Sequence, residues 1–294
     1  MRNQEQTQGF VLGLAAYGIW GLFPLFFSLL TSIQPTQVLL HRVIWSCLFV
    51  ALLITLRRGW TKLGPHLRNA KLWRALGASS LLIAANWLIF IYAVGQQKVL
   101  ATSLGYFMTP LVSAALAVLF LGEHLNRLRL IAIGLALAAI VWQVIQLGAL
   151  PWIPISLALT FGIYGLVRKQ TPIDTLSGLL LETALLLPVA LVYWLWLSVQ
   201  GNSQFLEQMD LTLLMMTSGV VTALPLLAFA AAAKRLSLMA IGFMMYLNPT
   251  LQFLTAVMLF EEPFAVDQLI SFVCVWTALA VFSYDALRQR GPGA

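Results

Sequence analysis

The sequence has few charged residues. Only 9% of its 294 residues are Asp, Glu, Lys or Arg, and 61% are hydrophobic, whereas an ordinary soluble domain has about 25% charged residues. Too few polar side chains are present to cover a water-facing surface. Apolar runs of about twenty residues, each long enough to cross a hydrocarbon core as a helix, recur along the chain. The composition therefore predicts an all-α integral membrane protein.

The motifs of soluble enzymes are missing as well. The chain contains no HExxH, GxSxG or GxxxxGK[ST] pattern, and its three histidines, His41, His66 and His124, are scattered. Zinc peptidases, serine hydrolases and Walker-type nucleotide sites depend on such arrangements. We therefore expect no enzymatic activity, no cofactor, no metal site and no transport driven by a nucleotide bound to this chain.

Cysteine is scarce, and the excess of basic residues needs an explanation other than nucleic acid. Cys47 and Cys274 both fall in apolar runs, where a small buried thiol is the ordinary interpretation. Basic residues outnumber acidic ones by 17 to 10. Because they lie between apolar runs, they indicate membrane orientation rather than nucleic-acid binding.

Apolar runs bounded by charged residues, Pro, Gly and Asn predict ten helices. The first run is too long for the core of a signal peptide, and no small-residue cleavage pattern follows it, so we expect it to be retained. The predicted ranges are 9–31, 36–56, 72–95, 99–121, 128–147, 150–168, 175–198, 211–233, 238–260 and 265–286.

Basic residues orient these ten helices. If both termini are cytoplasmic, every Lys and Arg lies on the cytoplasmic side except Lys98, which lies outside, and Arg42, which lies within a span. This is the distribution that the positive-inside rule requires, and adding or removing one helix would scramble it.

An internal repeat divides the chain into two halves, 1–148 and 149–294, of five helices each. Segment 104–125 (LGYFMTPLVSAALAVLFLGEHL) resembles 241–264 (IGFMMYLNPTLQFLTAVMLFEEPF), and 16–23 (AYGIWGLF) more weakly resembles 160–167 (TFGIYGLV). Because five is odd, the halves must insert with opposite orientation, which is a recurrent plan of secondary transporters. The matched residues are Gly105 with Gly242, Pro110 with Pro249, Glu123 with Glu262, and Trp20 with Tyr164.

Two ionisable residues lie deep inside predicted spans. Arg42 is the deep cation and Glu182 the deep anion. A charge in hydrocarbon costs about 2.5–3.5 kcal/mol even on the lenient insertion scale, so such residues are functional candidates. We expect both to face one central cavity, as a direct pair or as two poles of a binding site. A pair that only fixes helix packing is the alternative.

Polar and aromatic side chains complete the predicted substrate site. Trp45 lies one turn after Arg42 and can cover its guanidinium or face lipid, and His41 can titrate or simply pack. Asn86 shares a helix face with Phe90 and binds substrate or joins helices. The other candidates flank the two prolines of the repeat. The full predicted set is Arg42, Glu182, Trp45, His41, Asn86, Phe90, Tyr106, Tyr246 and Asn248.

Six blocks carry a family resemblance over essentially the whole chain. They are GLAAYGIWGLFPLFF, LLHRVIWS, NWLIFIYAV, ATSLGYFMTPLVSAALAVLFLGE, YGLVRK and LLLETALLLPVALVY. In this order and spacing they resemble RarD-type proteins, bacterial inner-membrane members of the EamA-like branch of the drug/metabolite transporter superfamily. The resemblance implies ten helices in two inverted repeats and a secondary transporter, often an exporter, with alternating access. One departure is Glu261, which replaces the glycine expected before Glu262.

These observations predict a ten-helix secondary transporter of the bacterial cytoplasmic membrane, with both termini inside. It would export small polar or amphipathic solutes, such as amino-acid-like metabolites or drugs. Its partners would be the substrate and the lipid bilayer, with protons as a candidate coupling ion at Glu182. The alternative is a non-transporting scaffold or lipid-handling protein with a purely structural Arg42/Glu182 pair.

Overall fold

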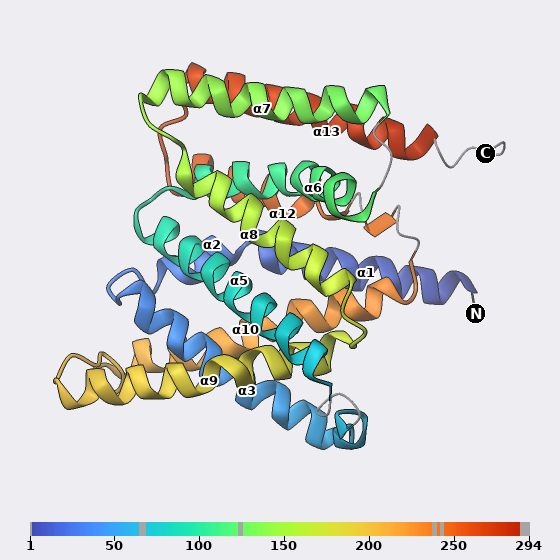
Figure 1. Ribbon diagram of the computed structural model, residues 1–294. Coiled ribbons are helices and arrows are strands. Elements are labelled where there is room, and N and C mark those ends of the chain that lie inside the picture. Colours follow the sequence, from blue (N-terminus) through green and yellow to red (C-terminus); the bar gives the residue numbers. More distant parts are fainter. Residues whose placement is uncertain (1, 65–68, 123–125, 237–239, 242–243, 289–294) are drawn as a thin grey trace.

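The computed structural model describes residues 2–64, 69–122, 126–236, 240–241 and 244–288. Over these residues all regular secondary structure is helical, so the all-α prediction is confirmed (Figure 1). The elements are α1 (Arg2–Gly21), α2 (Phe23–Ser28), α3 (Pro35–Leu56), η1 (Trp60–Lys62), α5 (Ala70–Gly95), α6 (Val99–Leu121), α7 (Arg127–Leu147), α8 (Trp152–Lys169), α9 (Thr175–Val199), α10 (Met209–Ala233), α12 (Leu247–Leu254), η2 (Thr255–Leu259) and α13 (Val266–Arg288).

Eight stretches of the described chain are long and apolar enough to cross a membrane, and Leu247–Leu259 is a shorter apolar helix. The multi-pass prediction is confirmed, whereas the number of ten crossings stays a prediction. The eight stretches are Gln4–Ser28, Pro35–Leu56, Ala70–Gly95, Val99–Phe120, Arg127–Leu147, Thr175–Val199, Met209–Ala233 and Val266–Asp285.

Two predicted helices are interrupted in the structure. The run 9–31 is divided into α1 and α2, with Pro24 in the first turn of α2, where its missing N–H costs nothing. The run 238–260 forms α12, which continues into the π-helical η2. In contrast, α6 passes through Pro110 without ending. The repeated prolines therefore occupy different local structures.

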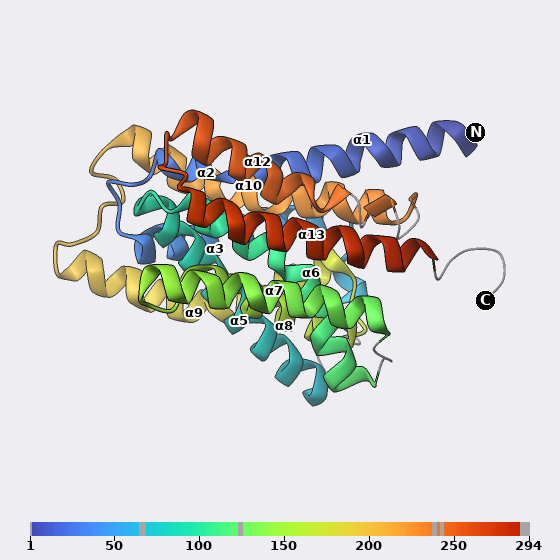
Figure 2. The same ribbon diagram turned by 90° about the horizontal axis from the view of Figure 1, so that it is seen from above.

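Helices of the two predicted halves interleave. α7 packs along α13 at one edge of the molecule, and the next layer contains α6, α8 and α12 (Figures 1 and 2). On the other side, α1 packs on α10, and α3 packs on both α9 and α10. The interior is therefore walled by both halves together.

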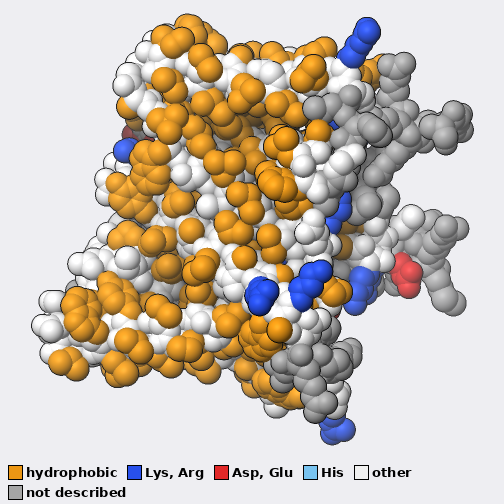
Figure 3. Space-filling view, in the orientation of Figure 1, with side chains coloured by type: hydrophobic (Ala, Val, Ile, Leu, Met, Phe, Trp, Pro, Cys, Tyr) orange, Lys and Arg blue, Asp and Glu red, His pale blue; other side chains and the backbone are white. Residues whose placement is uncertain are grey.

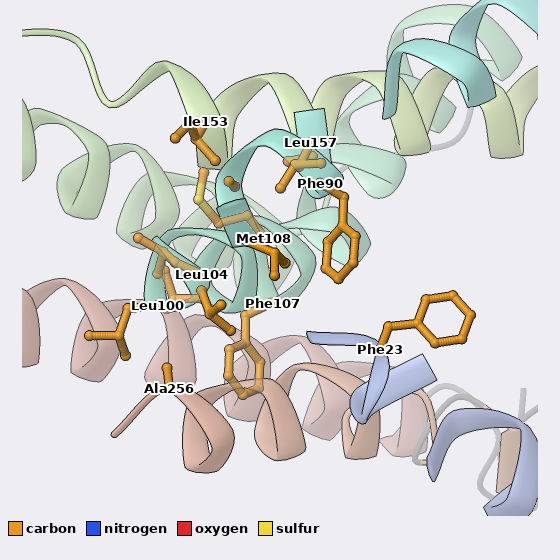
Figure 4. Close-up of a cluster of buried hydrophobic side chains, with 14 of the residues drawn as sticks. Phe23, Phe90, Leu100, Leu104, Phe107, Met108, Ile153, Leu157 and Ala256 are labelled. Atoms are coloured by element: carbon orange, nitrogen blue, oxygen red, sulfur yellow. The ribbon is translucent and has the colours of Figure 1, made fainter. Parts of the chain in front are cut away.

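A large hydrophobic cluster extends from α2 to α13, and Figure 4 shows its part between α2, α5, α6, α8 and η2. Gly105 of α6 lies so close to α8 that an added Cβ would stand 2.9 Å from backbone atoms of Pro154. Small residues at such crossings let transmembrane helices approach closely, because packing, rather than escape from water, drives their association. The side chains labelled in Figure 4 are Phe23, Phe90, Leu100, Leu104, Phe107, Met108, Ile153, Leu157 and Ala256.

The start of α1 and the end of α13 lie at the same end of the molecule (Figures 1 and 2). On the face shown in Figure 3, hydrophobic side chains cover the middle, and most Lys and Arg side chains gather toward that end. The apolar middle is the surface expected of a protein solvated by lipid.

The two repeated Gly/Glu turns adopt related backbone geometry. Gly122 has a φ of 67°, and Glu261 has a φ of 51°. Glu261 thus takes the left-handed conformation that the glycine takes in the first half. The next residue, Glu262, accepts hydrogen bonds from the backbone N–H groups of Val99 (2.6 Å) and Leu100 (2.9 Å) and so caps α6. The matching Glu123, and Gly242, lie outside the described residues.

Candidate functional site

A central cavity of about 500 Å³ is walled by residues of α1, α2, α3, α5, α6, α8, α9, α10 and α12. Aromatic rings dominate its wall, and the charged side chains among the described lining residues are all basic. The rings belong to Tyr17, Trp20, Phe23, Trp87, Phe90, Tyr106, Phe161, Tyr164 and Phe229, and the cations to Arg42, Arg168 and Lys169. This size and composition suit a small amphipathic ligand.

Arg42 lies deep in this cavity wall and is 3% exposed. Its Nε donates a hydrogen bond of 2.7 Å to Oγ1 of Thr222 on α10, whereas Nη1 has no hydrogen-bond partner among the described residues. The guanidinium lies 4.2 Å from the ring centre of Trp87 and 5.1 Å from that of Phe27. Rings and one hydroxyl therefore surround this cation.

Gly219 explains how Thr222 reaches Arg42. An added Cβ at Gly219 would collide with backbone atoms of Trp45 and Ser46 on α3, so the glycine lets α10 approach α3 closely. Thr222 follows one helical turn later and points toward Arg42.

Glu182 is 1% exposed and is held by three side chains. Ser79 donates to its Oε1 (2.6 Å), and Tyr164 donates to its Oε2 (3.3 Å). Nε of Arg168, in the last turn of α8, lies 3.7 Å from Oε1. Tyr164 and Arg168 line the cavity, and Glu182 lies behind them. The carboxylate of Glu182 is thus balanced by a cation of α8, the helix that precedes α9 in the chain.

Of the two arrangements that the sequence left open, a direct Arg42–Glu182 pair and two poles of one site, the direct pair is not formed: across the described chain, Glu182 makes its ion pair with Arg168. Arg42 is the eighth residue of α3, and Glu182 is the eighth residue of α9. The two helices pack together and run in opposite directions (Figure 1). At about 1.5 Å per residue, each charge lies about 10 Å from the start of its own helix, and these two starts lie at opposite ends of the bundle, so the charges lie at different depths.

Asn86 and Phe90, predicted to share a face, both line the cavity. The Asn86 amide donates to the Leu157 carbonyl (3.1 Å) and to Thr160 Oγ1 (3.0 Å) and accepts from the Tyr106 hydroxyl (3.1 Å). It thus ties α5 to α6 and α8 and fixes Tyr106 in the wall.

Asn248 also lines the cavity, as the sequence led us to expect. Its Oδ1 accepts from Nε2 of Gln252 (2.8 Å), and Oε1 of Gln252 accepts from Thr102 (2.8 Å). Tyr246 instead lies at a separate hollow beside α13, where its hydroxyl is 3.2 Å from Ser283 Oγ. Tyr246 and Asn248 are two residues apart at the start of α12, a spacing that places them on different sides of a helix.

His41 and Trp45 are not among the residues that line the cavity. The His41 ring stacks on Phe205 at 4.4 Å, and Trp45 lies 6.4 Å from the same ring. Covering Arg42 was one of the positions that the sequence allowed for Trp45, but the rings over the guanidinium are those of Trp87, Phe27 and Phe23. Spacing along one helix allowed the Trp45 contact, and neighbouring helices supplied closer rings.

Hydrogen bonds hold the connection between α9 and α10 against the start of α3, at the left of Figure 1. Gln37 donates to the Asn202 carbonyl (3.0 Å) and accepts from the Gln204 N–H (2.9 Å). Gln204 also donates to the Ser32 carbonyl (3.1 Å). Phe205 then packs between His41 and Trp194. These contacts cover the end of the bundle at which α3, the helix that carries Arg42, begins.

Sequence reasoning missed Thr222, Trp87 and Arg168. Thr222 is an ordinary hydroxyl in an apolar helix, and Arg168 was assigned to a cytoplasmic helix end. One signal was available: Trp20 and Tyr164 were matched by the weak internal repeat, and both line the cavity.

The helices and the cavity together define a multi-pass membrane protein with a central ligand-sized site, the construction of a transporter. Residues 7–145 match the EamA-like transporter family. The chain is 41% identical over 288 residues to Protein RarD of Escherichia coli (strain K12), covering 98% of this chain and 97% of that protein. It is 44% identical over 294 residues to the uncharacterized transporter PA0485 of Pseudomonas aeruginosa, covering 98% and 97%.

The chain belongs to the EamA-like transporter family and is a RarD-type protein. A solved crystal structure of a protein aligns with a TM-score of 0.59 over 93% of this chain and 96% of that one. The two sequences are 16% identical, so this likeness concerns the fold alone.

Proposed function

We propose that this transporter is a secondary exporter of small amphipathic solutes, a class that includes amino-acid-like metabolites and drugs. It spans the bacterial cytoplasmic membrane ten times, with both termini inside, and works by alternating access without ATP hydrolysis. The observation that carries the proposal is a central cavity between the helices, with aromatic walls and a buried cation, Arg42.

The orientation rests on charge. Arg168 and Lys169 lie where the cavity approaches the end of the bundle that holds the start of α1. Basic residues favour the cytoplasmic side, so the cavity is reached from the cytoplasm. A solute to be exported would enter there.

Alternating access is supported by unequal packing of matched helices. If α5 corresponds to α10 and α3 to α9, then the α3–α10 and α5–α9 contacts are equivalent, yet α3 packs on α10 far more extensively. The fastened α9–α10 connection closes the opposite end. We interpret the structure as one of two related states, open inward, in which exchanging the roles of the halves opens the other end.

Glu182 is the candidate site for proton coupling. Its carboxylate holds Arg168 and Tyr164, which both line the cavity. Protonation of Glu182 would weaken its hold on Arg168, so proton binding would change the charge that a solute meets. Glu182→Gln is then expected to transport without a response to an imposed pH gradient.

A purely structural Arg42/Glu182 pair was the basis of the scaffold alternative. Glu182 pairs with Arg168 instead, so no specific observation favours that alternative. Arg42 has a wall position in the cavity that a scaffold would not need.

An accumulation screen tests the proposal. Metabolites and added drugs are measured in cells that make the wild-type protein, Arg42→Gln, or no protein, with the exposed Lys234→Gln as the matched loss of one positive charge. We expect at least one solute to leave faster with the wild-type protein and with Lys234→Gln only. If no solute differs between wild-type cells and cells without the protein, the transport proposal fails.

A reversible cross-link tests alternating access. Gln37→Cys and Gln204→Cys, with Cys47 and Cys274 replaced by Ala, should form a disulfide that keeps the α9–α10 connection fastened. Oxidation should stop transport, and reduction should restore it. The single Gln37→Cys variant should not respond, and full transport by the oxidised double variant would contradict the mechanism.

A further inference from the structure

Arg42 has no anionic partner, and this determines what the cavity can bind. Its guanidinium makes one hydrogen bond, to Thr222, and no ion pair among the described residues. Burying a cation is unfavourable unless a counter-charge and hydrogen bonds compensate it. The surrounding rings offset part of that cost. A carboxylate would supply what is missing.

The rest of the cavity wall favours the same sign of ligand. Arg168 and Lys169 lie toward its cytoplasmic end, and the described lining residues include no Asp or Glu. Both oxygens of Glu182 are already occupied by Ser79, Tyr164 and Arg168. An ammonium group would therefore find no carboxylate facing it, whereas an anion meets Arg42.

The arrangement of the site restricts how many charged groups the ligand carries and how polar the rest of the ligand is. Arg168 is paired with Glu182, so Arg42 offers the main uncompensated charge at the deep end. Thr222 holds Nε, and the buried Nη1 has no hydrogen-bond partner among the described residues, so an incoming anion would find an unpaired donor there. Phe90, Tyr106 and Phe161 line the same cavity, with the Tyr106 ring tilted against Phe90 and edge to ring with Phe161. One anionic group and a flat apolar body fit this arrangement.

We propose that the transported solutes are organic monocarboxylates with an aromatic or similarly apolar body, whose carboxylate pairs with the guanidinium of Arg42. An arginine fork matches a carboxylate with two parallel hydrogen bonds. The inference rests on the proposed transport function and narrows it, because an amine is not required and a permanent cation is rejected.

Binding of a matched probe series tests the assignment. The protein in nanodiscs of zwitterionic lipid is titrated calorimetrically with 3-phenylpropionate, 3-phenylpropanamide, 3-phenylpropylamine and phenylalanine, and empty nanodiscs correct for partition. We expect 3-phenylpropionate to bind at least about tenfold more tightly than the other three, because only it brings an uncompensated anion. Equal or tighter binding of the amide, the amine or phenylalanine overturns the proposal, as does no binding of 3-phenylpropionate.

Variants locate the carboxylate. Arg42→Gln should weaken binding of 3-phenylpropionate at least about 30-fold, and Lys234→Gln should leave it unchanged. Arg42→Lys, which keeps the charge but loses the fork, and Thr222→Val, which frees Nε, should each fall between these limits. They keep the test decisive if Arg42→Gln does not fold. Unchanged binding in both Arg42→Lys and Thr222→Val excludes Arg42 as the anion site.

Two further arms separate the possible failures. 2-Phenylethylphosphonate tests the head group, and binding as tight as that of the carboxylate overturns the choice of a carboxylate. Counterflow in liposomes tests movement. If 3-phenylpropionate binds through Arg42 but does not move, the transport function fails while the binding assignment stands. If the amine moves and the carboxylate does not bind, the assignment fails while transport stands.

Discussion

Arg42 in the first half and Glu182 in the second occupy the same place in their helices but have different surroundings. Glu182 has an ion pair and two hydrogen bonds, whereas Arg42 has one hydroxyl and three rings. A compensated buried charge stabilises one arrangement of helices. An uncompensated one leaves binding energy for a ligand, which is why we place Arg42 at the site and Glu182 behind it.

Exchanging the two charges should have the largest effect. In Arg42→Glu/Glu182→Arg the cavity would present a carboxylate, and the new arginine would face Arg168. We expect transport to fall to background, roughly 100-fold or more, and no recovery relative to either single variant. Restored transport, measured in liposomes, would mean that the two residues act as one pair and would remove the difference between them.

The next largest difference concerns two glycines near the two charges, whose replacement by alanine should lower stability by different amounts. Gly219→Ala places a Cβ against the backbone of α3, and Gly178→Ala places one against the flexible end of Arg168. We expect Gly219→Ala to lower stability by about 2–4 kcal/mol and to displace Thr222 from Arg42, because backbone cannot yield as a side chain can. Thermal unfolding in detergent measures the stability of the two variants. A larger loss in Gly178→Ala would reverse the interpretation.

Neutralising Glu182 should damage stability, whereas neutralising Arg42 should not. Glu182→Gln leaves Arg168 without its counter-charge at a partly exposed helix end, and we expect a loss of about 2 kcal/mol. The double variant Arg168→Gln/Glu182→Gln should recover most of it. Arg42→Gln should unfold at the wild-type temperature or above. A marked fall for Arg42→Gln would show that Arg42 is structural.

The smallest difference concerns the repeated turns. Glu261→Gly should stabilise the protein by about 1 kcal/mol, because a residue with a side chain pays for left-handed backbone that glycine adopts freely. Gly122→Ala should cost a similar amount, since no atom of the described residues lies within 4 Å of its Cβ position and the positive φ opposes the change. The two unfolding temperatures should therefore move in opposite directions.

Part of the cavity wall and both buried charges could be predicted from the sequence. Arg42 and Glu182 stood out because charges are rare in apolar runs, and both are buried. Asn86 with Phe90 followed from helical periodicity, and both line the cavity. The partners of the two charges could not be predicted. Trp87 lies next to Asn86 in the sequence, yet only the packing of α5 on α3 brings its ring over Arg42.

The sequence by itself determined the helical, membrane-embedded character of the chain, the ranges of most helices and the burial of Arg42 and Glu182. These depend on hydropathy, periodicity and the cost of charge in lipid, all of which act locally along one segment. Only the tertiary structure decided that Arg168 balances Glu182, that Arg42 has one hydroxyl partner and no ion pair among the described residues, and that His41, Trp45 and Tyr246 lie away from the cavity. Those outcomes depend on the depth, rotation and close approach of neighbouring helices, which no single segment encodes.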